Sequence, residues 1–245
     1  MATHAQQTTW KLYEKRYSRL VEDVRFTHIG QGKFGGGHDF THALMVARYA
    51  VLIAEDPDTG RLAWIAAICH NADRIYPDLD VDQITSYLYD CLLVTDLDEE
   101  EKRLVVEAVL EHHNLNKPED SPALVVLKDA DRLANIGPNL FIRSGQHYHM
   151  LPAYDPRYVA HSDPEATYKN PKTVLHDVMC SLEWEPWLRT PKAQAIAALY
   201  FEFFRKFKRF FEHQMREVGF VDDEGNTTYP FPKDLELAYQ QEAAH

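Results

Sequence analysis

Cysteine is scarce in this chain of 245 residues. The three that it has, Cys69, Cys91 and Cys180, cannot all pair with one another, and each lies in an apolar segment with a helical pattern. Because disulfides persist in oxidising compartments, this odd number indicates buried, reduced thiols and a cytoplasmic protein. The first residues also lack a basic stretch followed by an apolar one, so no secretory signal is expected.

Positive charge is also in short supply. Lysine and arginine number 26 against 38 aspartates and glutamates, which gives a formal net charge of −12. Such a surface repels polyanions, so we expect no DNA or RNA partner. A small nucleotide is still compatible, because a metal or a few cations can reverse the charge inside a pocket. No apolar run reaches the length of a membrane span, and no membrane partner is expected.

What the sequence has in abundance is helical periodicity. Apolar residues make up 45% of the chain and recur at three- and four-residue steps, which predicts an all-α fold. We expect helices over residues 10–24, 40–55, 61–70, 80–93, 122–135, 173–184 and 192–218, and one around 104–110 that is opened by cap residues at 95–101. The 61–70 pattern also suits a buried strand, but its alanines favour a helix.

The chain shows no linker and no internal repeat, so residues 1–245 are predicted to form a single domain. The motifs described below fall in a core over about 23–145, and the C-terminal helices over about 173–218 are expected to pack on it. Glycines from Gly30 to Gly37 predict a flexible connector, with a phosphate cradle as the alternative. Prolines over about 145–172 predict a long loop of the kind that often serves as a lid. After Pro232 we expect a short helix.

Histidines and carboxylates gather at four places on these apolar helices. They are His38-Asp39-Phe40-Thr41-His42, His70-Asn71, His112-His113 and Asp129-Ala130-Asp131-Arg132-Leu133. Burying such groups is costly unless they are paired or bind a metal. Histidine with aspartate suits Mn, Fe, Co, Ni or Zn, and with added waters also Mg. The pattern therefore predicts a divalent-metal site.

The order of these motifs resembles that of the HD-domain metal-dependent phosphohydrolases, over roughly residues 23–218. Within that superfamily, the His-Asp-x-x-His opening and the Asp-Ala-Asp-Arg-Leu segment followed by Ile-Gly are similar to an uncharacterised bacterial and fungal subgroup. The resemblance implies a helical HD fold with metal ligands at His42, His70, Asn71 and Asp131. It also implies a hydrolase acting on a small phosphorylated metabolite or nucleotide.

Asn71 departs from the family pattern, in which a His-Asp pair supplies a carboxylate. An amide oxygen still coordinates a metal, but it is neutral and a poor bridge between two ions. We therefore expect one weakly held metal, or none. The alternative function is a catalytically degenerate HD-like protein that binds a nucleotide or metabolite. A redox enzyme with two irons, as in some HD relatives, is a third option that the missing carboxylate disfavours.

Other polar residues near the motifs are candidates for catalysis and for phosphate binding. The candidates for orienting or deprotonating a water are Asp73, Asp129 and His113, and those for binding the substrate are Lys33, Arg74, Arg132, Arg143 and His38. Structural roles compete with these. His112 and His113 can cap a helix end. Asp129 faces away from Asp131 in a helix, because residues two apart do not share a face.

Six phenylalanines lie between residues 201 and 211 at helical spacing, with basic residues between them. Such a stripe is typical of a helix face that packs in the core. A homodimer interface is the alternative, with membrane contact a distant third.

Overall fold

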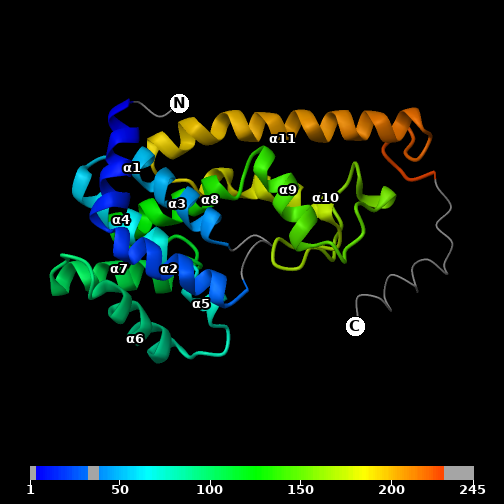
Figure 1. Ribbon diagram of the computed structural model, residues 1–245. Helices are drawn as coiled ribbons and strands as arrows, with labels where there is room; N and C mark the ends of the chain where they lie inside the picture. Colours follow the sequence, from blue (N-terminus) through cyan, green and yellow to red (C-terminus); the bar gives the residue numbers. More distant parts are fainter. Residues whose placement is uncertain (1–3, 33–38, 229–245) are drawn as a thin grey trace. The chain divides into compact units, whose positions relative to one another are not determined.

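The computed structural model describes residues 4–32 and 39–228 (Figure 1). Its α-helices are α1 (His4–Arg16), α2 (Ser18–Gly30), α3 (Phe40–Ile53), α4 (Pro57–Cys69), α5 (Ala72–Ile75), α6 (Val81–Leu92), α7 (Glu99–Glu111), α8 (Pro122–Ala134), α9 (Pro138–His147), α10 (Val174–Cys180) and α11 (Pro191–Glu217), and its 3₁₀ segments are Pro156–Tyr158 and Ser181–Trp187. Extended pairing in these ranges is limited to two isolated bridges, so the predicted all-α class is confirmed. Lys33, His38 and the helix expected after Pro232 lie outside the described residues.

Side-chain caps explain where many of the helices begin. The side chains of Asp39, Asp56, Asp80, Asp98 and Ser121 each accept a hydrogen bond from a backbone N–H in the first turn of the helix that follows. These bonds satisfy amides that a helix start otherwise leaves without a partner. The starts predicted from the cap residues at 95–101 and from Ser121 are therefore confirmed.

The described chain divides into two compact units. The first contains the residues up to 135 and residues 186–197, and the second contains residues 136–185 and those from 198 onward. The single domain expected from the sequence stays a prediction. No helix in the described ranges is long and apolar enough to cross a membrane.

The core of the first unit lies where α3, α4 and α8 meet. Helix α4 is buried on nearly every side, and Trp64, Ile65 and Ile68 in it are fully buried. Val46 from α3 and Leu127 from α8 are also fully buried. Burial of this apolar surface holds the three helices together and fixes the positions of the polar groups that they carry. Cys69 is buried beside this core, and all three cysteines are free thiols, as predicted.

Several helix boundaries differ from the sequence prediction. Helix α4 begins at Pro57 instead of residue 61, and the helix expected over 173–184 is α-helical only to Cys180 and continues as a 3₁₀ segment. The single helix expected over 10–24 is broken at Tyr17 into α1 and α2, and the Tyr17 ring packs against Trp64 with centroids 5.9 Å apart. The Gly137-Pro138 pair, expected only as a stop, also opens α9. Gly137 has φ of +82°, and a Cβ there would lie 2.9 Å from the Tyr200 ring, so both conformation and space require glycine.

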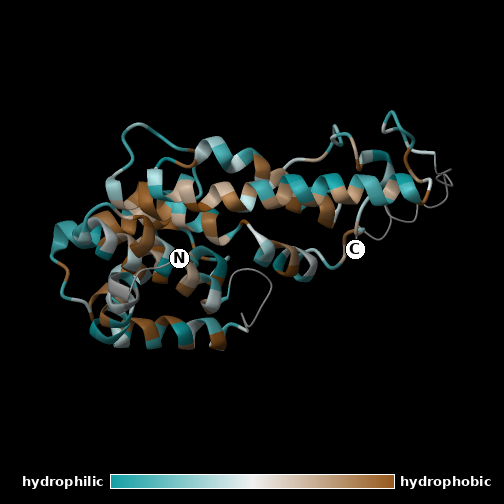
Figure 2. Ribbon diagram, turned by 90° about the horizontal axis from the view of Figure 1, so that it is seen from above, coloured by the Kyte–Doolittle hydropathy of each residue, from teal (hydrophilic) through white to brown (hydrophobic). Residues whose placement is uncertain are grey.

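In the second unit, α9 and α11 meet through aromatic rings. Phe141 has ring centroids at 5.6, 5.7 and 4.5 Å from those of Phe203, Phe204 and Phe207. Phe204 is fully buried, whereas Phe210 is 72% exposed. Figure 2 shows hydrophilic and hydrophobic residues interleaved along the length of α11. Part of the phenylalanine face therefore does pack in a core, and the homodimer alternative stays a prediction.

Candidate metal centre

Three of the expected metal ligands come together in the first unit. His42 from α3, His70 at the end of α4 and Asp131 from α8 each offer one ligand atom, and these atoms all lie within 4.8 Å of one another. Asp131 Oδ1 is 3.1 Å from His42 Nε2 and 3.8 Å from His70 Nε2. The histidines are buried, while a quarter of the Asp131 side chain, 24%, reaches solvent. Two of the three candidate ligands are therefore shielded from solvent, and the Asp131 carboxylate is the one that solvent reaches.

Hydrogen bonds fix the orientation of two buried rings at this centre. His70 Nδ1 lies 2.7 Å from the carbonyl oxygen of Ala67, and His112 Nδ1 lies 2.6 Å from that of Val109. A carbonyl only accepts, so each Nδ1 carries a hydrogen and donates it, which leaves the Nε2 lone pair on the other side of the neutral ring. Both Nε2 atoms are buried and have no hydrogen-bond partner among the described residues. An orphaned imidazole lone pair of this kind fits a metal ion.

The electrostatic environment keeps the protonation states that metal binding needs. Burial lowers the pKa of His70 well below its ordinary value. Burial and the neighbouring His113 lower the pKa of His112 to about 4. Burial alone would raise the pKa of Asp131, but the hydrogen bond and charge of His42 outweigh it and hold that pKa well below the usual range. His70 and His112 are therefore neutral imidazoles, and Asp131 is an ionised carboxylate.

Asn71, the fourth expected ligand, is buried at the start of α5. Its Nδ2 lies 3.4 Å from His28 Nε2 and 3.5 Å from the backbone oxygen of Asp39. Asn71 follows His70 directly in the chain, and its side chain contacts His28, a further buried histidine from α2.

Asp73 and His113 form a second polar pair beside the buried histidines. His113 Nε2 is 3.0 Å from Asp73 Oδ2, and both side chains are about two-fifths exposed. Burial raises the pKa of Asp73, but the hydrogen bond and charge of His113, with the charge of Arg74, bring it down to about 2. The rings of His113 and His112 are 3.6 Å apart. The His112 ring is in turn 5.3 Å from that of His70, so this pair adjoins the metal cluster.

Two candidates have other contacts than those predicted. Asp129 is completely buried, and its Oδ2 accepts hydrogen bonds from the backbone amides of Arg189 and Thr190. Its carboxylate therefore joins α8 to the segment before α11. Arg132 donates to the backbone oxygen of Trp187 and to the Asn116 side chain. Both side chains therefore have structural contacts, and their predicted catalytic and substrate-binding roles stay predictions.

The remaining predicted phosphate-binding residues lie in different places. Arg74 is half-exposed, and its Nε is 3.6 Å from Asp73 Oδ2, next to the cluster. Arg143 belongs to α9 in the second unit, where its charge acts on Asp177. Arg74 therefore lies beside the pair of Asp73 and His113, whereas Arg143 lies in the second unit.

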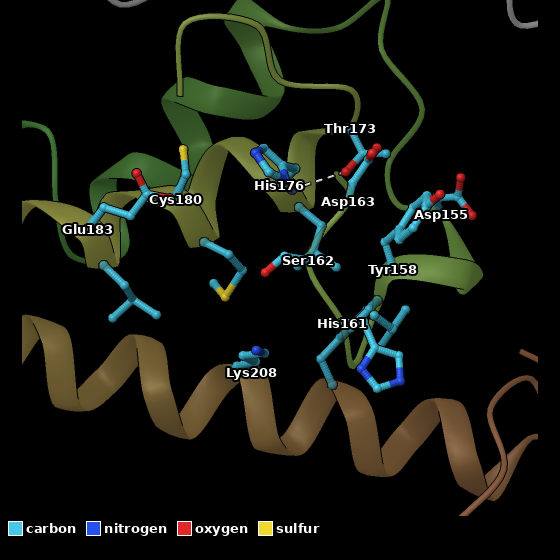
Figure 3. Close-up of a pocket in the computed structure, with 15 residues that line it drawn as sticks. Asp155, Tyr158, His161, Ser162, Asp163, Thr173, His176, Cys180, Glu183 and Lys208 are labelled. Atoms are coloured by element: carbon cyan, nitrogen blue, oxygen red, sulfur yellow. Dashed lines mark hydrogen bonds between the residues drawn. The ribbon is translucent and has the colours of Figure 1, made fainter. Parts of the chain in front are cut away.

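A hollow of about 240 Å³ lies within the second unit (Figure 3). Residues 155–163, α10 and α11 line it, with Lys208 and Phe211 on the α11 side. The backbone amide of His176 donates to Thr173 Oγ1 across 3.0 Å at its edge. No second group of three metal-ligating side chains as close as the cluster on α3, α4 and α8 occurs in the described ranges. The loop expected over 145–172 therefore lines this hollow, and its role as a lid stays a prediction.

Comparison with protein-family models gives a match to one part of the chain. Residues 39–136 match the model of the HD domain. This stretch begins at Asp39 and ends just after the Asp131 helix, so it contains the whole candidate metal cluster. This part of the chain is therefore similar to the HD domain. A comparison with curated proteins gives no match.

Solved structures show the same fold. A protein from Lactobacillus plantarum is 19% identical and aligns over 89% of this chain and 100% of its own length, with a TM-score of 0.63. Bacillus subtilis YpgQ in complex with ADP is 21% identical over 82% of this chain and 96% of its own, with a TM-score of 0.58. An HD-superfamily hydrolase from Bacillus thuringiensis is 17% identical over 83% and 98%, with a TM-score of 0.59. At these identities the likeness is one of fold.

The sequence gives no signal for His28, a buried histidine that contacts Asn71 beside the centre. His28 is a lone histidine on an amphipathic helix with no motif around it, which is more often a packed core residue. His112 is 5% exposed, and its ring lies edge-on to that of His70 and tilted against that of His113. Its position in the His112-His113 dipeptide was the available signal.

Proposed function

We propose that this protein is a metal-dependent phosphohydrolase that acts on a small phosphorylated metabolite or nucleotide. The observation that carries the proposal is the buried cluster of His42, His70 and Asp131, whose ligand atoms lie within 4.8 Å of one another. The complex of Bacillus subtilis YpgQ with ADP supports a nucleotide as the phosphorylated ligand.

His42, His70 and Asp131 would hold a divalent ion, and the oxygen of Asn71 would be a neutral fourth donor. Such an ion polarises a phosphoryl oxygen and lowers the pKa of a bound water. Two imidazoles with one carboxylate favour Mn, Fe, Co, Ni or Zn over Mg, which prefers oxygen ligands. Because only one of the four groups is charged, we expect one metal with modest affinity.

Asp73 and Arg74 supply the remaining chemistry from the protein itself. A carboxylate with a pKa of about 2 is ionised at neutral pH but is a weak base, so Asp73 orients a water rather than removing its proton outright. His113 fixes that carboxylate by its 3.0 Å hydrogen bond. Arg74 is exposed beside it and can neutralise a phosphate in an otherwise acidic protein.

The test is metal content and hydrolysis in matched variants. The purified protein is dialysed against Mn, Co, Ni, Zn or Mg, and bound metal is counted. Hydrolysis of nucleoside diphosphates, triphosphates and sugar phosphates is then measured with each ion. We expect H70A and D131A to lose both metal and activity. H213A, at an exposed position on α11, serves as a control that also removes one histidine. Retention of metal by H70A and D131A would overturn the proposal.

Asn71 favours a second candidate function, a catalytically degenerate HD-like protein that binds a nucleotide or metabolite. In that case the site would still bind a metal and a nucleotide or metabolite, but it would lack the carboxylate that the family pattern has at position 71. The same assay separates the two functions. Binding of ADP to the metal-loaded protein, measured by calorimetry, without turnover of any phosphorylated compound supports the second.

A further inference from the structure

His28 is a buried residue of α2, with 1% of its surface exposed, and it lies next to the metal cluster without being part of it. Its Nδ1 is 2.8 Å from the carbonyl oxygen of Val24 on its own helix, so this nitrogen carries a hydrogen and donates it. The ring also packs edge-on against Phe40, with centroids 5.8 Å apart. These two contacts hold the ring in one orientation.

The Nε2 atom of this ring faces the side chain of Asn71. The Asn71 Nδ2 lies 3.4 Å from His28 Nε2 and 3.5 Å from the backbone oxygen of Asp39. An amide nitrogen has two hydrogens and only donates, so His28 Nε2 must be the acceptor, as the Asp39 oxygen is. With its nitrogen facing two acceptors, the Asn71 amide has one favourable orientation, with Oδ1 turned away from both.

A carboxylate at position 71 would not fit these surroundings as long as the His28 ring carries a single hydrogen, on Nδ1. One of its oxygens would replace the amide nitrogen and lie against the lone pair of His28 and the oxygen of Asp39. A buried acceptor that faces other acceptors loses its hydrogen bonds, and a buried charge adds a further cost. Asparagine is therefore matched to its neighbours where the family pattern has aspartate.

We propose that His28 and Asn71 form a matched pair, in which His28 is a positioning residue that fixes the Asn71 amide and leaves its oxygen for the metal. The pairing concerns the protein alone. The role of the amide oxygen as a ligand rests on the proposed function. Asparagine at position 71, where the family pattern has aspartate, then has a hydrogen-bond acceptor in His28. The difference from the family pattern is therefore more than the loss of a charged ligand.

The test is a double-mutant cycle in metal-free protein, with N71D, H28Q and the double variant H28Q/N71D. Glutamine at position 28 can turn its amide hydrogens toward a carboxylate, whereas the fixed histidine presents a lone pair. At pH 8 we expect N71D to lower the Tm by roughly 5 to 10 °C in the native background, for a cost of one unpaired buried group. In the H28Q background we expect N71D to lower the Tm by less than half as much.

An exposed asparagine provides the matched control. N139D, in the first turn of α9, makes the same chemical change where a carboxylate is tolerated, and its Tm should stay within about 2 °C of the native value. If N71D does not fold, folding of H28Q/N71D alone supports the pairing, and failure of both overturns it. Equal effects of N71D in the two backgrounds also overturn it.

A metal titration distinguishes this inference from the proposed function. We expect H28Q to bind Ni²⁺ or Mn²⁺ about 10-fold more weakly than the native protein, because the amide that it no longer fixes would be a donor to the ion. If the native protein binds neither ion, the proposed function fails while the stability cycle still reports on the pair. If native and H28Q proteins bind equally, the positioning role is wrong.

Discussion

At the scale of single residues, Asp73 is the half-exposed carboxylate beside the buried histidines. We predict that D73N lowers kcat by about 100-fold, because an amide orients a water less well than an ionised carboxylate. The metal content should not change, since Asp73 is outside the cluster. The Tm should shift little, because a partly exposed ion pair contributes at most about 1 kcal/mol. Steady-state kinetics with metal analysis of the same samples checks this, and a parallel loss of metal would contradict it.

Single residues also show how far the sequence could predict the site. His42, His70 and Asp131 were predictable because each belongs to a short motif on an apolar helix, and buried polar groups there need a partner. The structure brings these three together. His28 was not predictable, because its partner Asn71 is 43 residues away in the chain and only the fold brings α2 to that position. The role of Asp129 was equally hidden, since the amides that it binds are 60 residues further on.

At the scale of secondary-structure elements, the contacts of Asp129 predict a stability effect. We expect D129A to leave the buried amides of Arg189 and Thr190 without a partner, at a cost of about 3 kcal/mol. The Tm should fall by roughly 6 to 12 °C. D98A removes the exposed cap of α7 and should cost only about 1 kcal/mol. Thermal unfolding by circular dichroism compares them, and neither variant should lose metal. A smaller shift for D129A than for D98A would contradict the anchoring role.

Elements that carry their own start signals were the easiest to predict. Helices α6, α7 and α8 begin within a few residues of the predicted positions, because their aspartate or serine caps are local in the sequence. The break at Tyr17 could not be predicted from the pattern, since the apolar periodicity continues through it, and the ring contact of Tyr17 with Trp64 joins residues far apart in the chain. Helix α9 was missed because Gly137 and Pro138 end one helix and begin another, which composition alone does not separate.

At the scale of the whole molecule, the metal cluster belongs entirely to one of the two compact units. His42, His70 and Asp131 all lie before residue 135, while α11 supplies residues to both units. If the chain is a single domain, as the sequence predicts, metal binding must stabilise both units together. Separate domains would instead show stabilisation of the metal-binding unit alone.

Thermal unfolding with and without metal measures this coupling. An ion present at about 100 times its Kd stabilises the folded state by about 2.7 kcal/mol, which for a chain of this size raises the Tm by roughly 5 to 10 °C. We predict one calorimetric transition that moves as a whole, because α11 continues without a break from the first unit into the second. D131A should show no shift at the same metal concentration, since it lacks the charged ligand. Two transitions, of which one moves and the other stays in place, would contradict the single domain while leaving the metal site intact.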